Sequence, residues 1–152
     1  MAVSSADMSY ATVDELRRRI GPAIFDEIYL SDGSDLSDKS DALTDLLAAA
    51  AEIDGAISSR YRLPVTGNVA LALLKDWCLT LAEERAFARP VGGEFTEKIK
   101  RRVDNVRKYL DMIRLGEFKL ADAPENTSNG AAKIALIRRN DAVFDRNKME
   151  GF

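Results

Sequence analysis

Three stretches of the chain carry the hydrophobic spacing of long helices. From Ala42 to Val65, apolar residues recur three and four positions apart, at Leu43, Leu46, Leu47, Ala50, Ile53 and Ile57. A second helix is predicted over about Val69 to Ala88. Its buried residues are expected to be Leu71, Leu74, Trp77 or Cys78, and Leu81. A third, over about Glu94 to Leu115, has a narrow seam of Ile99, Val103, Val106, Leu110 and Ile113. Such spacing places apolar side chains on one face of a helix.

Capping signals add two short helices near the N-terminus. Thr12-Val13-Asp14-Glu15 is a capping box that predicts a helix through Leu16 to about Ile20. Pro22 suits the first turn of another, roughly Ala23 to Tyr29. Asn68 is predicted to be an N-cap and Gly116 a C-cap, with at most a small hairpin near Leu63 to Val69. We therefore expect an all-α fold, a small bundle of three long and two short helices with an extended C-terminal tail.

The C-terminal part has a different character from the helical part. Ala121 to Ala132 lacks periodicity and predicts a linker, so we divide the chain into a helical domain, 1–120, and a linker with docking tail, 121–152. The tail carries apolar residues and arginines that do not fit a disordered end, namely Ile134, Leu136, Ile137, Arg138, Arg139, Phe144 and Phe152. Because exposed apolar side chains invite aggregation, we expect them to dock on a partner or a neighbouring copy.

Composition indicates a soluble globular protein without a membrane span. The 152 residues are 46% hydrophobic and 31% charged, and no run of 18 apolar residues occurs. Residues 1–10 do not resemble a signal peptide. Cys78 lies within an apolar helical pattern and is expected to be a buried small hydrophobe. These features favour folding in a reducing, cytoplasm-like environment.

The residue types argue against catalysis. The chain has no histidine, which removes the commonest acid–base group and metal ligand, and it contains no phosphate-binding or C-x-x-C motif. Asp32, Asp35, Asp38 and Asp41 recur every third residue, whereas a calcium-binding EF-hand loop needs oxygens at alternate positions. We expect no enzyme activity, catalytic residue, metal or cofactor. A carboxylate-dependent enzyme stays open as the less favoured alternative.

Charge is divided unevenly along the chain. Residues 1–60 carry a net charge of −7 and residues 61–152 a net charge of +4. The third long helix has a basic surface, formed by Lys98, Lys100, Arg101, Arg102, Arg107, Lys108 and Arg114. It is interpreted as a solvated face, a DNA-facing surface, or a contact with the acidic half of a neighbouring copy. A pI near 5.1 argues against a dedicated nucleic-acid binder, although a helical DNA-binding regulator remains an alternative.

One motif carries a family resemblance. The first long helix ends in Ile53-Asp54-Gly55 and is followed by Arg60-Tyr61-Arg62-Leu63-Pro64. With this helix and turn, the chain resembles the head–tail connector proteins (head-completion or adaptor proteins) of Mu-like and other tailed phages and prophages. The likeness extends from about Met8 to Gly116 and resumes at Phe144-Asp145-Arg146 and Gly151-Phe152.

The resemblance implies a structural role in the virion. Such a protein forms a ring, here expected to be dodecameric, beneath the portal protein and makes the surface on which the tail docks. Its partners would be the portal protein, a neck or tail-completion protein and copies of itself, with non-sequence-specific contact to genomic DNA in the channel and no membrane. It would lie at the head–tail interface of the virion, and in the host cytoplasm before assembly. The residues expected at the ring or portal interface are Arg60, Tyr61, Arg101, Arg102, Arg107 and Lys108.

Overall fold

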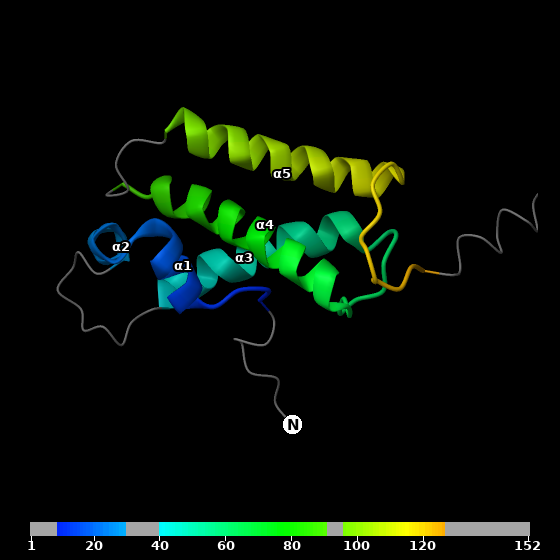
Figure 1. The fold of residues 1–152 in the computed structure, drawn as a ribbon. Helices are drawn as coiled ribbons and strands as arrows, with labels where there is room; N and C mark the ends of the chain where they lie inside the picture. The colour runs from blue at the N-terminus through cyan, green and yellow to red at the C-terminus, as the bar shows by residue number, and fades with distance from the viewer. Residues whose placement is uncertain (1–8, 30–39, 91–95, 127–152) are drawn as a thin grey trace, which may run out of the picture.

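The computed structural model describes residues 9–29, 40–90 and 96–126, and this part of the protein is all-α (Figure 1). The helices are α1 (Val13–Ile20), α2 (Pro22–Tyr29), α3 (Ser40–Ile57), α4 (Asn68–Phe87) and α5 (Glu97–Leu115). Three long and two short helices are thus confirmed. Residues 63–69, where the sequence allowed a small hairpin, contain no strand. An isolated antiparallel bridge joins Tyr61 and Glu125. Of the expected linker and tail, residues 127–152 lie outside the described residues.

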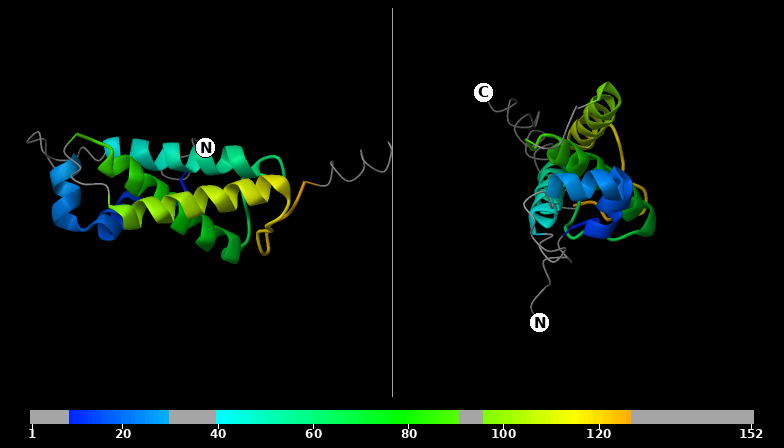
Figure 2. Two further views of the ribbon diagram at one scale, coloured as in Figure 1. Left: turned by 90° about the horizontal axis from the view of Figure 1, so that it is seen from above. Right: turned by 90° about the vertical axis from the view of Figure 1, so that its left-hand side faces the viewer.

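Helix α4 is the centre of the bundle. It packs against α3, α5 and α1, while α3 and α5 also contact each other. The short helices α1 and α2 lie together at one end of the three long helices (Figures 1 and 2). Every residue from 77 to 83 in α4 is buried, including Cys78, as expected from the sequence, and also Thr80 and Glu83. This stretch is covered on all sides and lies in the interior of the bundle, whereas the first two turns of α4 include exposed residues.

Most of the predicted core positions are buried. The whole seam of α5 is buried, as are Leu46, Ala50, Ile53 and Ile57 of α3. Leu43 and Leu47 are only partly buried. The prediction for Leu71 is wrong, because its side chain is 37% exposed. Leu71 lies in the first turn of α4, where it lines an open groove together with the loop residues Leu63–Val65.

The helix ends confirm two predicted caps and correct a third. Thr12 and Glu15 form the complete capping box of α1, and Gly116 ends α5 in a left-handed conformation, with φ 82°. At α4 the N-cap is Gly67 and not Asn68. Gly67 has φ 119°, and a side chain there would lie 2.6 Å from the backbone oxygen of Asp122. The position therefore requires glycine, since both its backbone angle and its space exclude a Cβ atom.

Residues 117–126 fold back onto the turn after α3. Leu120 is buried, and its N–H donates to the Tyr61 hydroxyl at 2.8 Å. The N–H of Arg62 donates to the carbonyl of Pro124 at 3.2 Å. Residues 121–126, which begin the expected linker, thus contact the helical body, and the rest of that linker lies outside the described residues.

Candidate docking surfaces

The motif at the end of α3 is divided between core and surface. Ile53 is fully buried, whereas Asp54 is partly exposed and accepts a hydrogen bond from the Tyr10 hydroxyl. Burial and the hydrogen bond to Asp54 raise the pKa of Tyr10 well above its ordinary value, so this phenol stays a neutral donor. Asp54 therefore has a neutral hydroxyl as its hydrogen-bond donor.

Arg60 and Tyr61, expected at an interface, both have intramolecular roles. The Arg60 guanidinium donates through Nε to the carbonyl of Arg114 at 3.3 Å. A Cβ atom at Gly116 would lie 2.9 Å from Arg60 Nη2, so this side chain covers the C-terminal end of α5, where a cation is favourable. Tyr61 is 3% exposed. In this structure its ring is a core contact and offers no surface to a partner.

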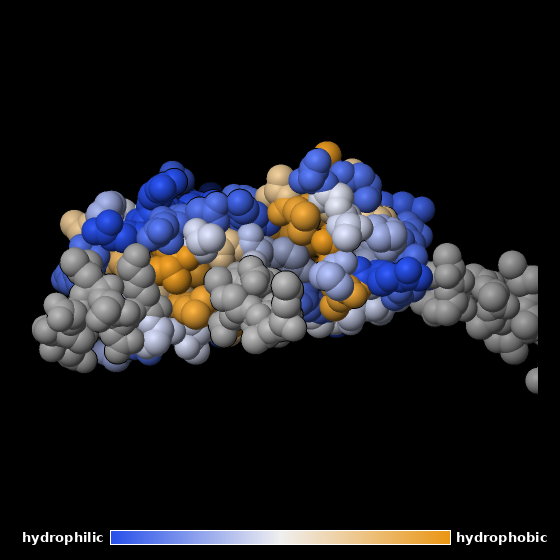
Figure 3. All heavy atoms as spheres, turned by 90° about the horizontal axis from the view of Figure 1, so that it is seen from below, coloured by the Kyte–Doolittle hydropathy of each residue, from blue (hydrophilic) through white to orange (hydrophobic). Residues whose placement is uncertain are grey.

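An open groove lies beside this turn. It has a volume of about 920 Å³, and its lining is mainly apolar, with Leu63, Pro64 and Val65 from the turn and Leu71 and Ala72 from α4. Asp54, Tyr10 and Lys75 add polar groups. We refer to it as the groove. Hydrophobic side chains reach the surface in two areas of the face that Figure 3 views from below, among largely hydrophilic ones. Concave apolar sites with a few polar groups are typical of binding sites.

Sequence reasoning missed most of the groove. Asp54, Leu63 and Pro64 had drawn attention as parts of the motif, but Tyr10, Leu71 and Lys75 had not. The sequence signal for Leu71 and Lys75 is weak, because it consists of an apolar residue and a cation in the first turns of a helix. Only the approach of the N-terminal segment to α3 and α4 brings these residues together.

The basic surface predicted on α5 is split in two. Lys98, Lys100, Arg101 and Lys108 are exposed, and we call them the outer cations. In contrast, Arg102 and Arg107 turn toward the bundle and form ion pairs with other helices. The sequence expectation of a single basic face is therefore too broad, because two of its arginines stabilise contacts within the body.

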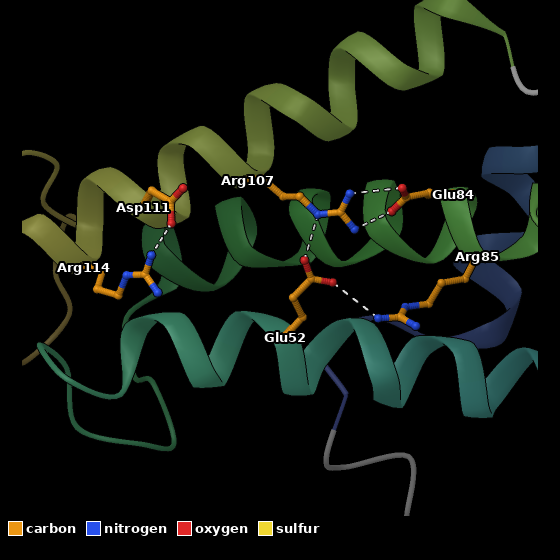
Figure 4. A network of polar contacts seen from close by, with 6 residues as sticks. All are labelled: Glu52, Glu84, Arg85, Arg107, Asp111 and Arg114. Carbon is orange, nitrogen blue, oxygen red and sulfur yellow. Dashed lines mark hydrogen bonds and ion pairs between the residues drawn. The ribbon is translucent and has the colours of Figure 1, made fainter.

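Arg107 joins α5 to both other long helices (Figure 4). Its Nε donates to Glu52 of α3 at 2.9 Å, and its two terminal nitrogens donate to Glu84 of α4 at 3.1 and 2.6 Å. Glu52 also pairs with Arg85 at 3.3 Å. Hydrogen bonds to Glu52 and then to Glu84 raise the pKa of Arg107 further above its ordinary value. The network fixes the three helices relative to one another at a partly exposed position.

Arg102 pairs with the buried carboxylate of Glu83. Its Nη2 donates to Glu83 Oε1 at 3.2 Å, and Arg19 of α1 lies 3.8 Å from Oε2. Among the described residues Glu83 Oε2 accepts no hydrogen bond. A buried charge held between two arginines is costly to leave unpaired, so Glu83 ties α1 and α5 to α4.

The other features considered from the sequence are metal ligands, the cysteine, a membrane span and the docking tail. The described residues contain no cluster of three or more potential metal ligands. Burial raises the pKa of the Cys78 thiol, which makes it a poor nucleophile. No described helix is both long and apolar enough to cross a bilayer. The expected docking-tail residues, Ile134, Leu136, Ile137, Arg138, Arg139, Phe144 and Phe152, lie outside the described residues.

Comparison with known proteins identifies a family. The search of curated proteins returns no match. The model of the family described as "Bacteriophage Mu, Gp36" matches residues 10–137, which include all five helices and the turn that forms the groove. The chain therefore belongs to the bacteriophage Mu Gp36 family and is a Mu-like phage protein.

Proposed function

We propose that this protein is a structural component of the virion, a head–tail connector or adaptor that forms a ring beneath the portal and presents the tail-docking surface. The observation that supports it best is the presence of two unlike surfaces on separate elements. The groove is lined by the N-terminal segment, α3, α4 and the turn between them, whereas the outer cations lie on α5. Contacts between unlike surfaces of successive copies close into rings when the rotation allows.

Charge provides a second pair of unlike surfaces. The outer cations of α5 are exposed, and so are carboxylates on the short helices, including Asp14 and Glu27. A cationic surface on one copy that faces an acidic surface on the next would steer association and weaken with salt. The partners of this protein would be other copies of itself, the portal protein and a neck or tail-completion protein. The protein would act without catalysis, at the head–tail interface.

Removing the protein from the phage tests the function. Particles made without it should be DNA-filled heads that carry no tails. Adding the purified protein and then free tails to these heads should restore infectivity. Tailed, infectious particles assembled in the absence of the protein would overturn the proposal.

The outer cations can be tested separately with a matched charge reversal. Arg101→Glu should lower ring formation, measured by native mass spectrometry at low and high salt, while Lys119→Glu beyond α5 makes the same charge change at another exposed site. Arg102 is unsuited to this test because it pairs with the buried Glu83. Ring formation that is unchanged in Arg101→Glu, together with a loss of salt-dependent DNA binding, would assign this face to genomic DNA.

A further inference from the structure

Both halves of the family motif meet at the groove. Asp54 comes from α3, and Leu63 and Pro64 come from the turn that follows it. Leu63 and Leu71 are each 37% exposed, and both line the same hollow. Single exposed leucines are ordinary on a protein surface, but apolar side chains grouped in a concave site indicate a ligand.

The charges in the groove define the chemistry of that ligand. Lys75 is already engaged, because its ammonium lies 2.9 Å from the Glu15 carboxylate. Asp54 accepts from the Tyr10 hydroxyl and has no ion pair within the described part of the chain. An apolar wall beside a carboxylate without a cation fits a segment of aliphatic residues followed by a basic one.

The described chain ends on the turn between α3 and α4, the turn that also supplies Leu63, Pro64 and Val65 of the groove. The N–H of Asn126 donates to the carbonyl of Arg60 at 2.8 Å, and its side chain donates to the carbonyls of Ser58 and Tyr61 at 3.1 and 3.3 Å. Residues 127–133 have a maximum reach of about 25 Å when fully extended. They lead to Ile134-Ala135-Leu136-Ile137-Arg138-Arg139, in which aliphatic residues precede two arginines. This order matches the chemistry of the groove.

We propose that the groove binds the C-terminal segment of a second copy of this chain. Ile134, Leu136 and Ile137 pack against the apolar wall, and an arginine of the pair that follows binds Asp54. The proposal rests on the ring formation proposed above, because a chain that carries both a donor segment and an acceptor groove links copies head to tail. Once two bodies are in contact, the tethered segment binds at a high effective concentration.

Cross-linking between cysteine variants of the full chain tests the proposal. Copies with Leu71→Cys in the groove are mixed with copies with Ile137→Cys and then treated with a mild thiol oxidant. Cys78 stays in place because it is buried. Covalent dimers are expected from the mixture, and a ladder of linked chains from the variant with both substitutions. Ile24→Cys, which replaces an exposed apolar residue of α2, is the control for Leu71→Cys and should give no dimer with Ile137→Cys.

Asp54→Asn tests the charge. An asparagine can still accept from Tyr10 but cannot bind an arginine as an ion pair, so the yield of linked dimer should fall about tenfold. A variant with both cysteines that links only within one chain would show that each subunit binds its own segment, and this overturns the proposal. Rings without any Leu71–Ile137 link would also overturn it, while leaving the connector function intact. If neither rings nor links form, the result would contradict both the groove proposal and the proposed connector function.

Discussion

Asp122 caps helix α4 from a distant part of the sequence, by accepting a hydrogen bond from the N–H of Ala70 at 3.0 Å. Its second carboxylate oxygen accepts from the N–H of Val69 at 3.1 Å. These N–H groups have no partner within the helix, and an anion also interacts favourably with the helix dipole there. Residues after α5 thus complete the start of α4.

Loss of this cap should destabilise the whole body. Asp122→Ala is expected to lower the free energy of unfolding by about 1 kcal/mol, as for other N-cap carboxylates. Urea unfolding followed by circular dichroism measures the change. Glu117→Ala, at another exposed acidic position beyond α5, serves as the control and should change little. An equal loss in both variants would contradict the capping role.

The position of a truncation should decide whether the body stays stable. A chain ending at Asn126 retains the Asp122 cap and should unfold at nearly the temperature of the full chain, yet fail to join the portal or neighbouring copies. A chain ending at Ala121 lacks the cap and the contacts of Asn126, so it should unfold at a lower temperature. Thermal unfolding and ring formation are the two measurements. If the chain ending at Asn126 unfolds at as low a temperature as the chain ending at Ala121, the tail belongs to the core and docking is the wrong interpretation.

Neutralising the buried Glu83 should lower the stability of the folded protein. In Glu83→Gln, Arg19 and Arg102 would lose their shared carboxylate, and we expect the free energy of unfolding to fall by about 1–3 kcal/mol. The adjacent Glu84, which pairs with Arg107 at a more exposed position, is the matched control. Glu84→Gln should cost about 1 kcal/mol or less. Chemical unfolding of the two variants side by side gives the comparison, and a similar loss in both would argue against the role of burial.

Acid should weaken the start of α1. Hydrogen bonding from the backbone of Thr12, and then from Lys75, lowers the pKa of Glu15 below its ordinary value of 4.5. A lowered folded-state pKa contributes stability above pH 4.5, and this contribution is lost as the pH falls through the folded-state value. Glu15→Gln should therefore lower stability at neutral pH and flatten its decline in acid. Unfolding free energies measured between neutral pH and pH 3 test this, and parallel pH profiles for both proteins would refute it.

Sequence alone was enough for features that depend on local periodicity. The seam of α5, the capping box at Thr12 and Glu15, and the C-cap at Gly116 all follow from residues within a few positions of one another. The spacing of apolar residues shows which side chains share a helix face, whatever that face packs against. The same reasoning placed the family motif at the end of α3.

Only the tertiary structure decided which polar and aromatic residues face inward. Tyr61 was expected at the ring or portal interface, yet its side chain is buried and its hydroxyl accepts a hydrogen bond from the N–H of Leu120. Arg107 and Arg101 look alike in sequence, but only Arg107 turns toward Glu52 and Glu84. These outcomes depend on partners from other helices and on the angle at which each helix meets its neighbours. A local pattern contains neither, which is why the cap from Asp122 and the groove at Asp54 emerge only once the chain is folded.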